Sequence, residues 1–204
     1  MKKFVFILLV TFVALSTHAE NAVGSWCVSP KLGLNLSTLS NSSDTKLRAT
    51  IIGGADIEYM ATNIFSLSFG ALYSQQGCKA HANGLDGTIK LDYINVPIMA
   101  NFYILGDVAF KIGIQPGFLV NDKVKASANG ASAEVGLEDA FRAAGLSSNT
   151  NSVVLDIPFG LSYQYSNLVF DLRYNLGVTK AFSAAGEGFK NRAFQITVSY
   201  KFKL

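Results

Sequence analysis

The chain has 204 residues, of which 50% are hydrophobic and only 15% are charged, and its mean hydropathy is positive. A membrane-spanning helix needs about 20 consecutive apolar residues, but the longest apolar run covers only residues 4–15 and contains Thr11. The composition argues against an ordinary water-soluble domain, and the sequence excludes a bundle of transmembrane helices.

The N-terminus has the three regions of a secretory signal peptide. Two lysines open the chain, residues 4–15 form the apolar segment, and Ala19 supplies the small residue before the cut. We predict that residues 1–19 are a signal peptide and that 20–204 form one domain. A retained N-terminal anchor is the alternative, although the apolar segment is too short to span a bilayer. Cleavage lowers the net charge from +3 to +1, and an exported chain without a basic cluster predicts no nucleic-acid partner.

The rest of the chain alternates apolar and polar residues with a period of two, which is the pattern of β-strands. In the last segment every even residue from Phe194 to Leu204 is apolar, and every odd residue from Ala193 to Lys203 is small or polar. The fourth segment changes parity near Tyr93, where a β-bulge would restore the pattern. Most segments are longer than the usual globular strand of about 5–6 residues. We predict eight strands, at about 27–37, 46–61, 64–76, 88–104, 108–121, 153–165, 168–178 and 193–204.

The connections between these strands alternate between short and long. Tight turns are predicted at 62–63, 105–107 and 166–167, and the long loops are 38–45, 77–87, 122–152 and 181–191. Short periplasmic turns alternating with long outer loops are typical of outer-membrane barrels. We therefore predict an all-β fold, an eight-stranded antiparallel up-and-down transmembrane β-barrel with a filled polar lumen.

Aromatic residues concentrate near the tight turns. Aromatic rings prefer the headgroup level of a membrane, so this clustering predicts an interfacial girdle, with ordinary core aromatics as the alternative. The residues are Tyr59, Phe65, Phe102, Tyr103, Phe110, Tyr163, Tyr165, Phe170, Tyr200 and Phe202.

The polar faces of the strands carry charges of both signs. An eight-stranded barrel is just wide enough for side chains to fill it, so we predict paired charges in a plugged lumen. The alternative is a half-exposed sandwich whose charges face bulk water. The proposed lumen charge network consists of Asp92, Asp156, Asp171, Arg173 and Lys201. The full set on the polar faces is Lys31, Arg48, Lys90, Lys111, Arg173, Lys201, Lys203, Asp56, Glu58, Asp92, Asp156 and Asp171.

Several stretches are similar to motifs of one known family. They are residues 91–97 (LDYINVP), 155–160 (LDIPFG), 170–179 (FDLRYNLGVT) and 200–202 (YKF). Over roughly 27–204 the chain resembles the PorT-like outer-membrane β-barrel domain family. The resemblance implies a single outer-membrane barrel without catalytic residues, and a link to secretion or surface display through the best-known namesake.

Two prolines, Pro97 and Pro158, fall inside predicted strands, and Pro158 departs from the usual family pattern. Because proline lacks the N–H that a ladder needs, we expect a bulge or local unpairing at each. Each follows an aspartate, Asp92 or Asp156. These aspartates are equivalent lumen features beside Arg173 on one interpretation, and simple packing elements on the other.

The sequence offers little for catalysis. The mature chain has one histidine, His81, with no Ser–acid constellation near it, and no strong metal-binding motif. We predict no enzyme, no cofactor and no metal site. Cys27 and Cys78 would pair in an oxidising compartment, but the strand order places them at opposite membrane faces, too far apart for a disulfide.

The loop at 122–152 contains a helical spacing of Leu137, Phe141 and Ala144, which predicts either a short amphipathic helix at the mouth or an ordinary variable loop. We predict an integral outer-membrane barrel with a structural or adhesion role, or one associated with secretion. Its partners would be outer-membrane lipid, the barrel-assembly machinery during insertion, and an envelope or secretion protein. The alternative is a soluble periplasmic barrel that binds an apolar ligand.

Overall fold

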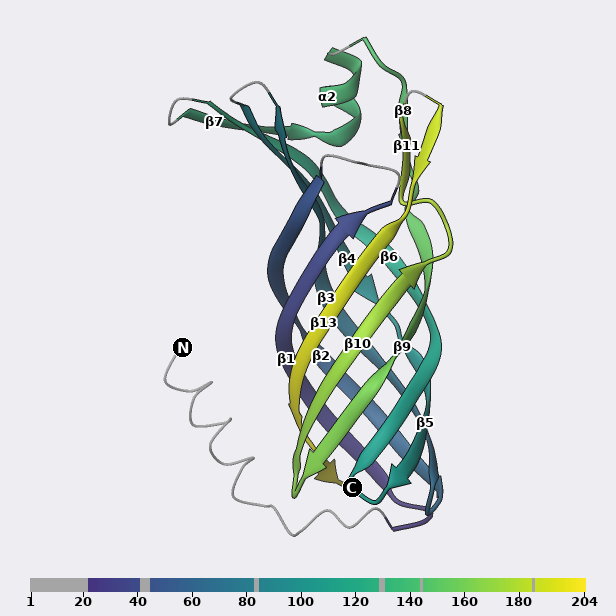
Figure 1. The fold of residues 1–204 in the computed structure, drawn as a ribbon. Helices are drawn as coiled ribbons and strands as arrows, with labels where there is room; N and C mark the ends of the chain where they lie inside the picture. Colours follow the sequence, from purple (N-terminus) through teal and green to yellow (C-terminus); the bar gives the residue numbers. More distant parts are fainter. Residues whose placement is uncertain (1–21, 41–44, 83–84, 129–130, 144, 185) are drawn as a thin grey trace.

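A computed structural model describes residues 22–40, 45–82, 85–128, 131–143, 145–184 and 186–204, so the predicted signal peptide lies outside the described residues. Eight antiparallel barrel strands form a closed ring (Figure 1). One of them is split into β4 and β5. The ring consists of β1 (Trp26–Leu39), β2 (Thr45–Thr62), β3 (Phe65–Ala82), β4 (Leu85–Asn95) with β5 (Ile98–Leu105), β6 (Val108–Ala128), β9 (Val153–Tyr165), β10 (Leu168–Gly177) and β13 (Asn191–Tyr200).

The ring closes between the first and last strands. Leu34 of β1 lies opposite Ile51 of β2 on one side and opposite Ile196 of β13 on the other. The short β14 (Phe202–Lys203) extends the last strand along β1. Every barrel strand thus has a neighbour on both sides, which removes the open sheet edge that would otherwise invite aggregation. The predicted eight-stranded up-and-down barrel is confirmed.

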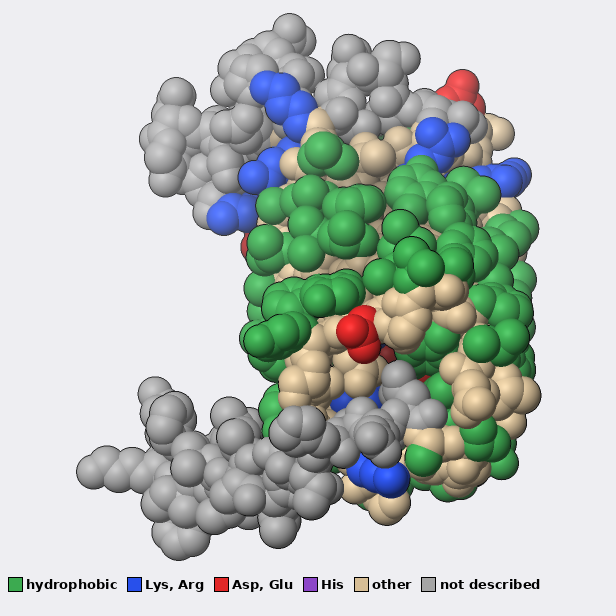
Figure 2. All heavy atoms as spheres, turned by 60° about the horizontal axis from the view of Figure 1, so that its bottom comes forward, with side chains coloured by type: hydrophobic (Ala, Val, Ile, Leu, Met, Phe, Trp, Pro, Cys, Tyr) green, Lys and Arg blue, Asp and Glu red, His purple; other side chains and the backbone are tan. Residues whose placement is uncertain are grey.

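The apolar face of the sheet points outward and the polar face points inward. On β10 the side chains of Leu168, Phe170 and Leu172 are exposed, whereas Asp171 and Arg173 on either side of Leu172 are buried. Apolar side chains cover most of the outer surface as a broad band (Figure 2). A soluble barrel that binds an apolar ligand requires an apolar interior and a polar outer surface, so the soluble alternative is wrong.

Tight turns join the strands at the end where the C-terminus lies (Figure 1). They fall at 63–64, 106–107 and 166–167, close to the predicted positions. Gly106 adopts a φ of 55° and Ser166 also adopts a φ of 55°, the left-handed conformation that two-residue hairpin turns require. In outer-membrane barrels the end with short turns is the periplasmic one.

The predicted irregularities at Tyr93 and Pro97 both occur. Asp92 lies opposite Asn121 but Tyr93 lies opposite Leu119, so Val120 of β6 is the extra residue of a bulge. Pro97 lies in the two-residue gap between β4 and β5. The expected bulge is therefore confirmed, although its extra residue belongs to the neighbouring strand.

Pro158 interrupts one ladder and leaves the other intact. On the β10 side it lies opposite Asn175. On the β6 side the pairing breaks between Phe159, opposite Ile112, and Asp156, opposite Gln115. Local unpairing beside a proline is what its missing N–H predicts.

The strands extend beyond the barrel at the outer end, where long loops were expected. The predicted loop at 77–87 is wrong, because β3 and β4 continue as a paired hairpin through most of it. The loop at 122–152 is also more ordered than expected, with β6 extended to Ala128. The further elements are β7 (Ala131–Gly136), α2 (Leu137–Ala143), β8 (Ser148–Thr150), β11 (Phe182–Ala184) and β12 (Glu187–Phe189).

An apolar cluster, which we call the cap, fills the space where the outer elements meet the barrel. Leu137 and Phe141 of α2 pack with Phe182 of β11, whose ring stacks on Phe189 at 4.8 Å. The helical interpretation of this loop is confirmed over Leu137–Ala143, directly after the strand Ala131–Gly136, and Ala144 lies outside the described residues. Among the described residues no helix is long and apolar enough to span a bilayer. The barrel residues of the cap are Leu39, Cys78, Leu91, Tyr93 and Val154.

Aromatic side chains ring the end with the tight turns, as the girdle prediction requires. Tyr163, Tyr165 and Phe170 are exposed there, and Trp26 joins them with its ring 4.8 Å from that of Tyr59. Tyr103 was wrongly included, because it points into the lumen, where only 9% of it is exposed. After the split of the fourth strand, the odd residues Met99, Asn101 and Tyr103 face the interior, and all three are buried.

A close backbone approach at Gly160 gives a testable consequence. A Cβ at this position would lie 2.0 Å from the carbonyl oxygen of Leu172 on the adjacent strand. We expect Gly160→Ala to lower the free energy of unfolding by about 1–3 kcal/mol, because the overlap forces the backbones apart. Urea unfolding in lipid vesicles measures this change. Gly53→Ala is the control, since its Cβ would meet the tip of Leu32 at 3.3 Å and the Lys31 carbonyl oxygen at an ordinary contact distance of 3.6 Å. An equal loss there would contradict the explanation.

Candidate functional site: the lumen charge network

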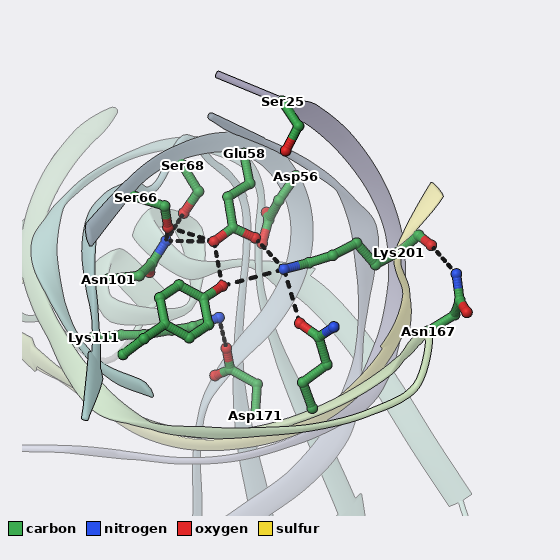
Figure 3. Close-up of polar contacts among 12 residues, drawn as sticks. Ser25, Asp56, Glu58, Ser66, Ser68, Asn101, Lys111, Asn167, Asp171 and Lys201 are labelled. Carbon is green, nitrogen blue, oxygen red and sulfur yellow. Dashed lines mark hydrogen bonds and ion pairs between the residues drawn. The ribbon is translucent and has the colours of Figure 1, made fainter. Parts of the chain in front are cut away.

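Buried charged side chains fill the half of the barrel nearer the tight turns. Figure 3 draws the contacts of Glu58, Lys111, Asp171 and Lys201. We call this set the lumen network. Four barrel strands, β1, β2, β6 and β10, supply its charges together with Lys201 after β13, because each strand places every second side chain in the interior. Its members are Lys31, Asp56, Glu58, Tyr103, Lys111, Asp171, Arg173 and Lys201.

Asp171 is the centre of one half of the network. Its Oδ2 accepts hydrogen bonds from Lys111 Nζ at 2.9 Å and from Arg173 Nη2 at 3.3 Å. Lys31 Nζ lies 3.9 Å from the same oxygen and pairs closely with Asp56. Only 2% of Asp171 is exposed. One carboxylate thus offsets charge from three cations in a space where unpaired charge would be costly.

Glu58 is the centre of the other half. Its Oε2 lies 2.9 Å from Lys201 Nζ, and its Oε1 accepts a hydrogen bond from the Tyr103 hydroxyl at 2.7 Å. Ser66 donates to the same Oε1, and Asn101 donates to it at 3.3 Å. Ionic and neutral donors together occupy both carboxylate oxygens, as a buried carboxylate needs.

Lys201 connects the network to the last tight turn. Its Nζ donates to the Tyr103 hydroxyl at 3.2 Å and to Gln164 Oε1 at 3.1 Å. The same Nζ lies 5.7 Å from the centroid of the Tyr103 ring, within cation–π range. Asn167 Nδ2 donates to the Lys201 carbonyl at 3.0 Å, which holds the backbone in place. Residues from β5, β9, the turn and the C-terminus are fixed together at this point.

The network leaves little free space. The cavity between Lys31, Lys111 and Lys201 has room for about one water molecule. Four cations face three carboxylates, so the network carries one net positive charge. A narrow, filled and charged interior matches the plugged lumen that an eight-stranded barrel predicts.

The structure divides the predicted network residues into separate groups. Asp171 and Arg173 contact each other, and Lys201 belongs to the same network through Glu58. Asp92 instead lies nearer the outer end, with its Oδ1 4.0 Å from Arg48 Nη1. Tyr73 and Asn121 also donate to Asp92, at 3.2 and 3.0 Å.

Asp156 forms a third, mostly uncharged level. Gln115 Nε2 donates to its Oδ2 at 3.4 Å, and Asn175 and Asn95 are buried on nearby lumen positions. Within the described part of the chain, neither Asp156 nor Asp92 forms an ion pair with Arg173. The expectation of two equivalent aspartates beside Arg173 is therefore wrong, because Asp92 shares the face of β4 that carries Ile94, whereas Tyr93 and Asn95 occupy the interior face.

Two further charges of the polar face lie elsewhere. Lys203 is exposed at the C-terminus. Lys90 lies in the outer hairpin, where it pairs with Glu134 of β7. Both residues lie on parts of the strands that extend past the barrel. Alternation alone therefore predicts too many interior residues at both ends of the barrel.

Sequence reasoning missed the uncharged members of the site. Tyr103, Asn101 and Ser66 each donate a hydrogen bond to Glu58, beside its contact with Lys201. The sequence does contain a signal for two of them, because Asn101 and Tyr103 alternate with the apolar Phe102 and Ile104. A parity count restarted at Pro97 would have placed both in the lumen.

The remaining chemistry-bearing residues form no further site. The two cysteine thiols are free and buried. Cys27 pairs with Lys203 near the tight turns, whereas Cys78 belongs to the cap at the other end. Among the described residues, no three metal-ligating side chains lie close enough together to hold an ion. The side chain of His81 lies outside them.

The closed ring, the outward apolar band, the polar plugged interior and the aromatic belt define an integral outer-membrane β-barrel protein. The chain belongs to the outer membrane protein beta-barrel domain family, whose model matches residues 17–183. This match supports the outer-membrane family in general, and the PorT-like branch stays a prediction. No curated protein sequence matches the chain.

Solved barrels are similar to the chain over most of its length. The attachment invasion locus protein Ail of Yersinia pestis has 16% identity and a TM-score of 0.46, covering 89% of this chain and 100% of its own. Neisserial surface protein A has 15% identity and a TM-score of 0.49, covering 87% and 97%. OprG from Pseudomonas aeruginosa has 13% identity and a TM-score of 0.42, covering 88% and 96%. Family membership rests on the family model and not on these likenesses.

The Tyr103 hydroxyl provides a test of the network. We expect Tyr103→Phe to lower the free energy of unfolding by about 1–3 kcal/mol, because a buried hydrogen bond to a charged group is lost. The midpoint of urea unfolding in vesicles reports the change. Tyr163→Phe is the control, since its exposed ring lies on the lipid side. Equal effects of the two substitutions would show that the Glu58 contact contributes nothing.

Proposed function

We propose that the protein is a non-enzymatic anchor in the outer membrane, with a structural or adhesion role carried by its outer elements. The observation that carries this proposal is the double closure of the lumen. The lumen network fills the half near the tight turns, and the cap covers the opposite mouth. A barrel closed twice offers no path for a solute, so its function belongs to what it displays.

The outer elements are built to display a defined surface. The ring of Phe141 on α2 lies 6.1 Å from that of Phe182 on β11. Glu138, Asp139 and Arg142 of the same helix remain exposed. Packing on one helix face and exposed charge on the other is the amphipathic pattern of a surface helix.

A secretion-associated role is the second form of this proposal. It requires an envelope or secretion protein that binds the barrel, and the PorT-like resemblance supports it. In both forms the barrel-assembly machinery inserts the protein after residues 1–19 are removed. The absence of enzymatic activity is part of the proposal, supported by a lumen network in which Asp56, Glu58 and Asp171 are held by lysine and arginine.

Two measurements test the proposal. We expect the purified protein in planar bilayers to show no steady conductance, and cells that display it to attach to surfaces better than cells without it. The variant Glu138→Lys/Asp139→Lys should reduce attachment, whereas Asp107→Lys at a periplasmic turn should not. Steady solute-selective channels would overturn the anchor role. Unchanged attachment together with a secretion defect on deletion would favour the second form.

A further inference from the structure

Five lysines share one face of the sheet that extends beyond the barrel. Lys46 of β2 lies directly opposite Lys79 of β3. Lys90 of β4 lies directly opposite Lys123 of β6. Directly opposed residues point to the same face of a sheet. Lys79 and Lys125 both lie opposite Thr88. Thr88 is two residues from Lys90 on β4 and therefore points to the same face, so all five lysine side chains share that face.

The other face of the same sheet is apolar. Cys78 of β3 lies opposite Ile89 of β4, which lies opposite Val124 of β6. These three side chains pack in or against the cap. The extension therefore has two unlike faces, one buried under α2 and one basic.

The basic face continues the lipid-facing surface of the barrel. Ile94 is 43% exposed on the outer side of β4, and Lys90 follows four residues further along on the same face. This separation is about 13 Å along the strand, and less along the membrane normal because the strands are tilted. The lysines thus follow directly above the apolar band, at the depth of the outer headgroups.

The tilt of the extension turns this face toward the bilayer. In Figure 1 the strands that lead to β7 lean away from the barrel axis at the outer end. Figure 2, with the other end of the barrel turned forward, shows Lys and Arg side chains gathered beyond the apolar band on that side. The basic face is therefore visible from the membrane side.

Among the side chains that the structure describes on this face, five lysines are accompanied by two carboxylates, those of Glu134 and Asp92. Like charges directly opposite each other on neighbouring strands are destabilising. Glu134 of β7 pairs with Lys90, and its hydrogen bond with Lys90, together with the charges of Lys123 and Lys125, lowers the pKa of its carboxyl. Asp92 on the same face is engaged by Arg48, Tyr73 and Asn121.

We propose that this lysine face binds the phosphate groups of anionic lipid headgroups in the outer leaflet. Lysine binds phosphate as a point charge, and a bound anion relieves the repulsion between the facing lysine pairs. The orientation toward the bilayer favours a lipid over a soluble polyanion. This role goes beyond the anchor function and does not depend on what the outer helix binds.

The test follows thermal unfolding of the whole refolded protein in neutral detergent, read from its mobility shift on gels. Because a ligand that binds the folded state stabilises it, we expect added diphosphoryl lipid A to raise the unfolding temperature by several degrees. Phosphatidylcholine should not raise it, and high salt should abolish the rise because exposed charges are screened. The variant Lys46→Gln/Lys79→Gln/Lys123→Gln should lose most of the rise.

The matched control removes three cations from the opposite side of the same outer end, with Lys180→Gln/Lys190→Gln/Arg192→Gln, and should keep the rise. An equal rise in both triple variants, or none in the unmodified protein, would overturn the proposal. So would an equal rise with inorganic phosphate or with a soluble sulphated polysaccharide. If the triple variant fails to fold, Lys79→Gln alone should show a reduced rise. Attachment measured with the α2 variants is separate, so failure of either proposal is recognised independently.

Discussion

Asp171→Asn is expected to be among the most destabilising single substitutions in this barrel. The change removes the one carboxylate that contacts both Lys111 and Arg173 and lies 3.9 Å from Lys31. Removing one partner from a buried charge group costs about 3–5 kcal/mol, because the remaining charges stay desolvated without compensation. Urea titration in lipid vesicles, read from the gel mobility of the folded form, measures the loss. On heating, the gel band of the folded form should also disappear at a lower temperature for Asp171→Asn than for the unmodified protein.

Asp156→Asn is the matched control for that experiment. It also removes a buried lumen carboxylate, but one whose described contact is with the neutral Gln115 at 3.4 Å. We expect little or no loss of stability, because asparagine keeps an acceptor oxygen and no cation loses its partner. If Asp156→Asn were as damaging as Asp171→Asn, ion pairing would not be the reason for the effect.

Leu172→Arg is expected to give the largest effect on the outer face. Leu172 lies in the middle of β10, is 48% exposed, and is flanked by Leu161 and Ile196 on the adjacent strands. An arginine at the midplane of a barrel's lipid face costs about 2–4 kcal/mol. Folding yield into vesicles and the urea midpoint should both fall.

Leu105→Arg is the control that introduces the same charge at a different depth in the membrane. Leu105 is 75% exposed beside a tight turn, where the same substitution costs only about 0–1 kcal/mol. A barrel that tolerates arginine equally well at both positions would not have lipid against the middle of β10. The pair of variants therefore tests the orientation of the faces as well as the position of the membrane.

The parts of the fold that follow from local alternation are predictable from the sequence. From Leu168 to Arg173 every even residue is apolar, and the structure exposes Leu168, Phe170 and Leu172 while burying the residues between them. Pro97 and Pro158 mark interruptions because the missing N–H is a local property. The outer hairpins were mistaken for loops because their small and basic residues resemble loop composition, although they continue the pairing.

The candidate site was only partly predictable for the same reason. Alternation identifies Asp171, Arg173 and Lys201 as interior residues, but it does not say at which height each one lies. Height depends on the stagger between strands and on bulges. Asp92 has the parity of the outward-facing Ile94 on β4, and it meets Arg48 and not Arg173.

The sequence by itself determined that the hydrophobic residues of this protein occupy every second position of long strands. Such strands require lipid against their apolar face and a polar interior on the other side. It also determined the strand number and the tight turns, since both depend on short segments. Only the tertiary structure decided which charges meet, that Tyr103 completes the Glu58 site, and that five lysines share one face above the membrane. These features join residues from different strands, and closure of the ring sets their register.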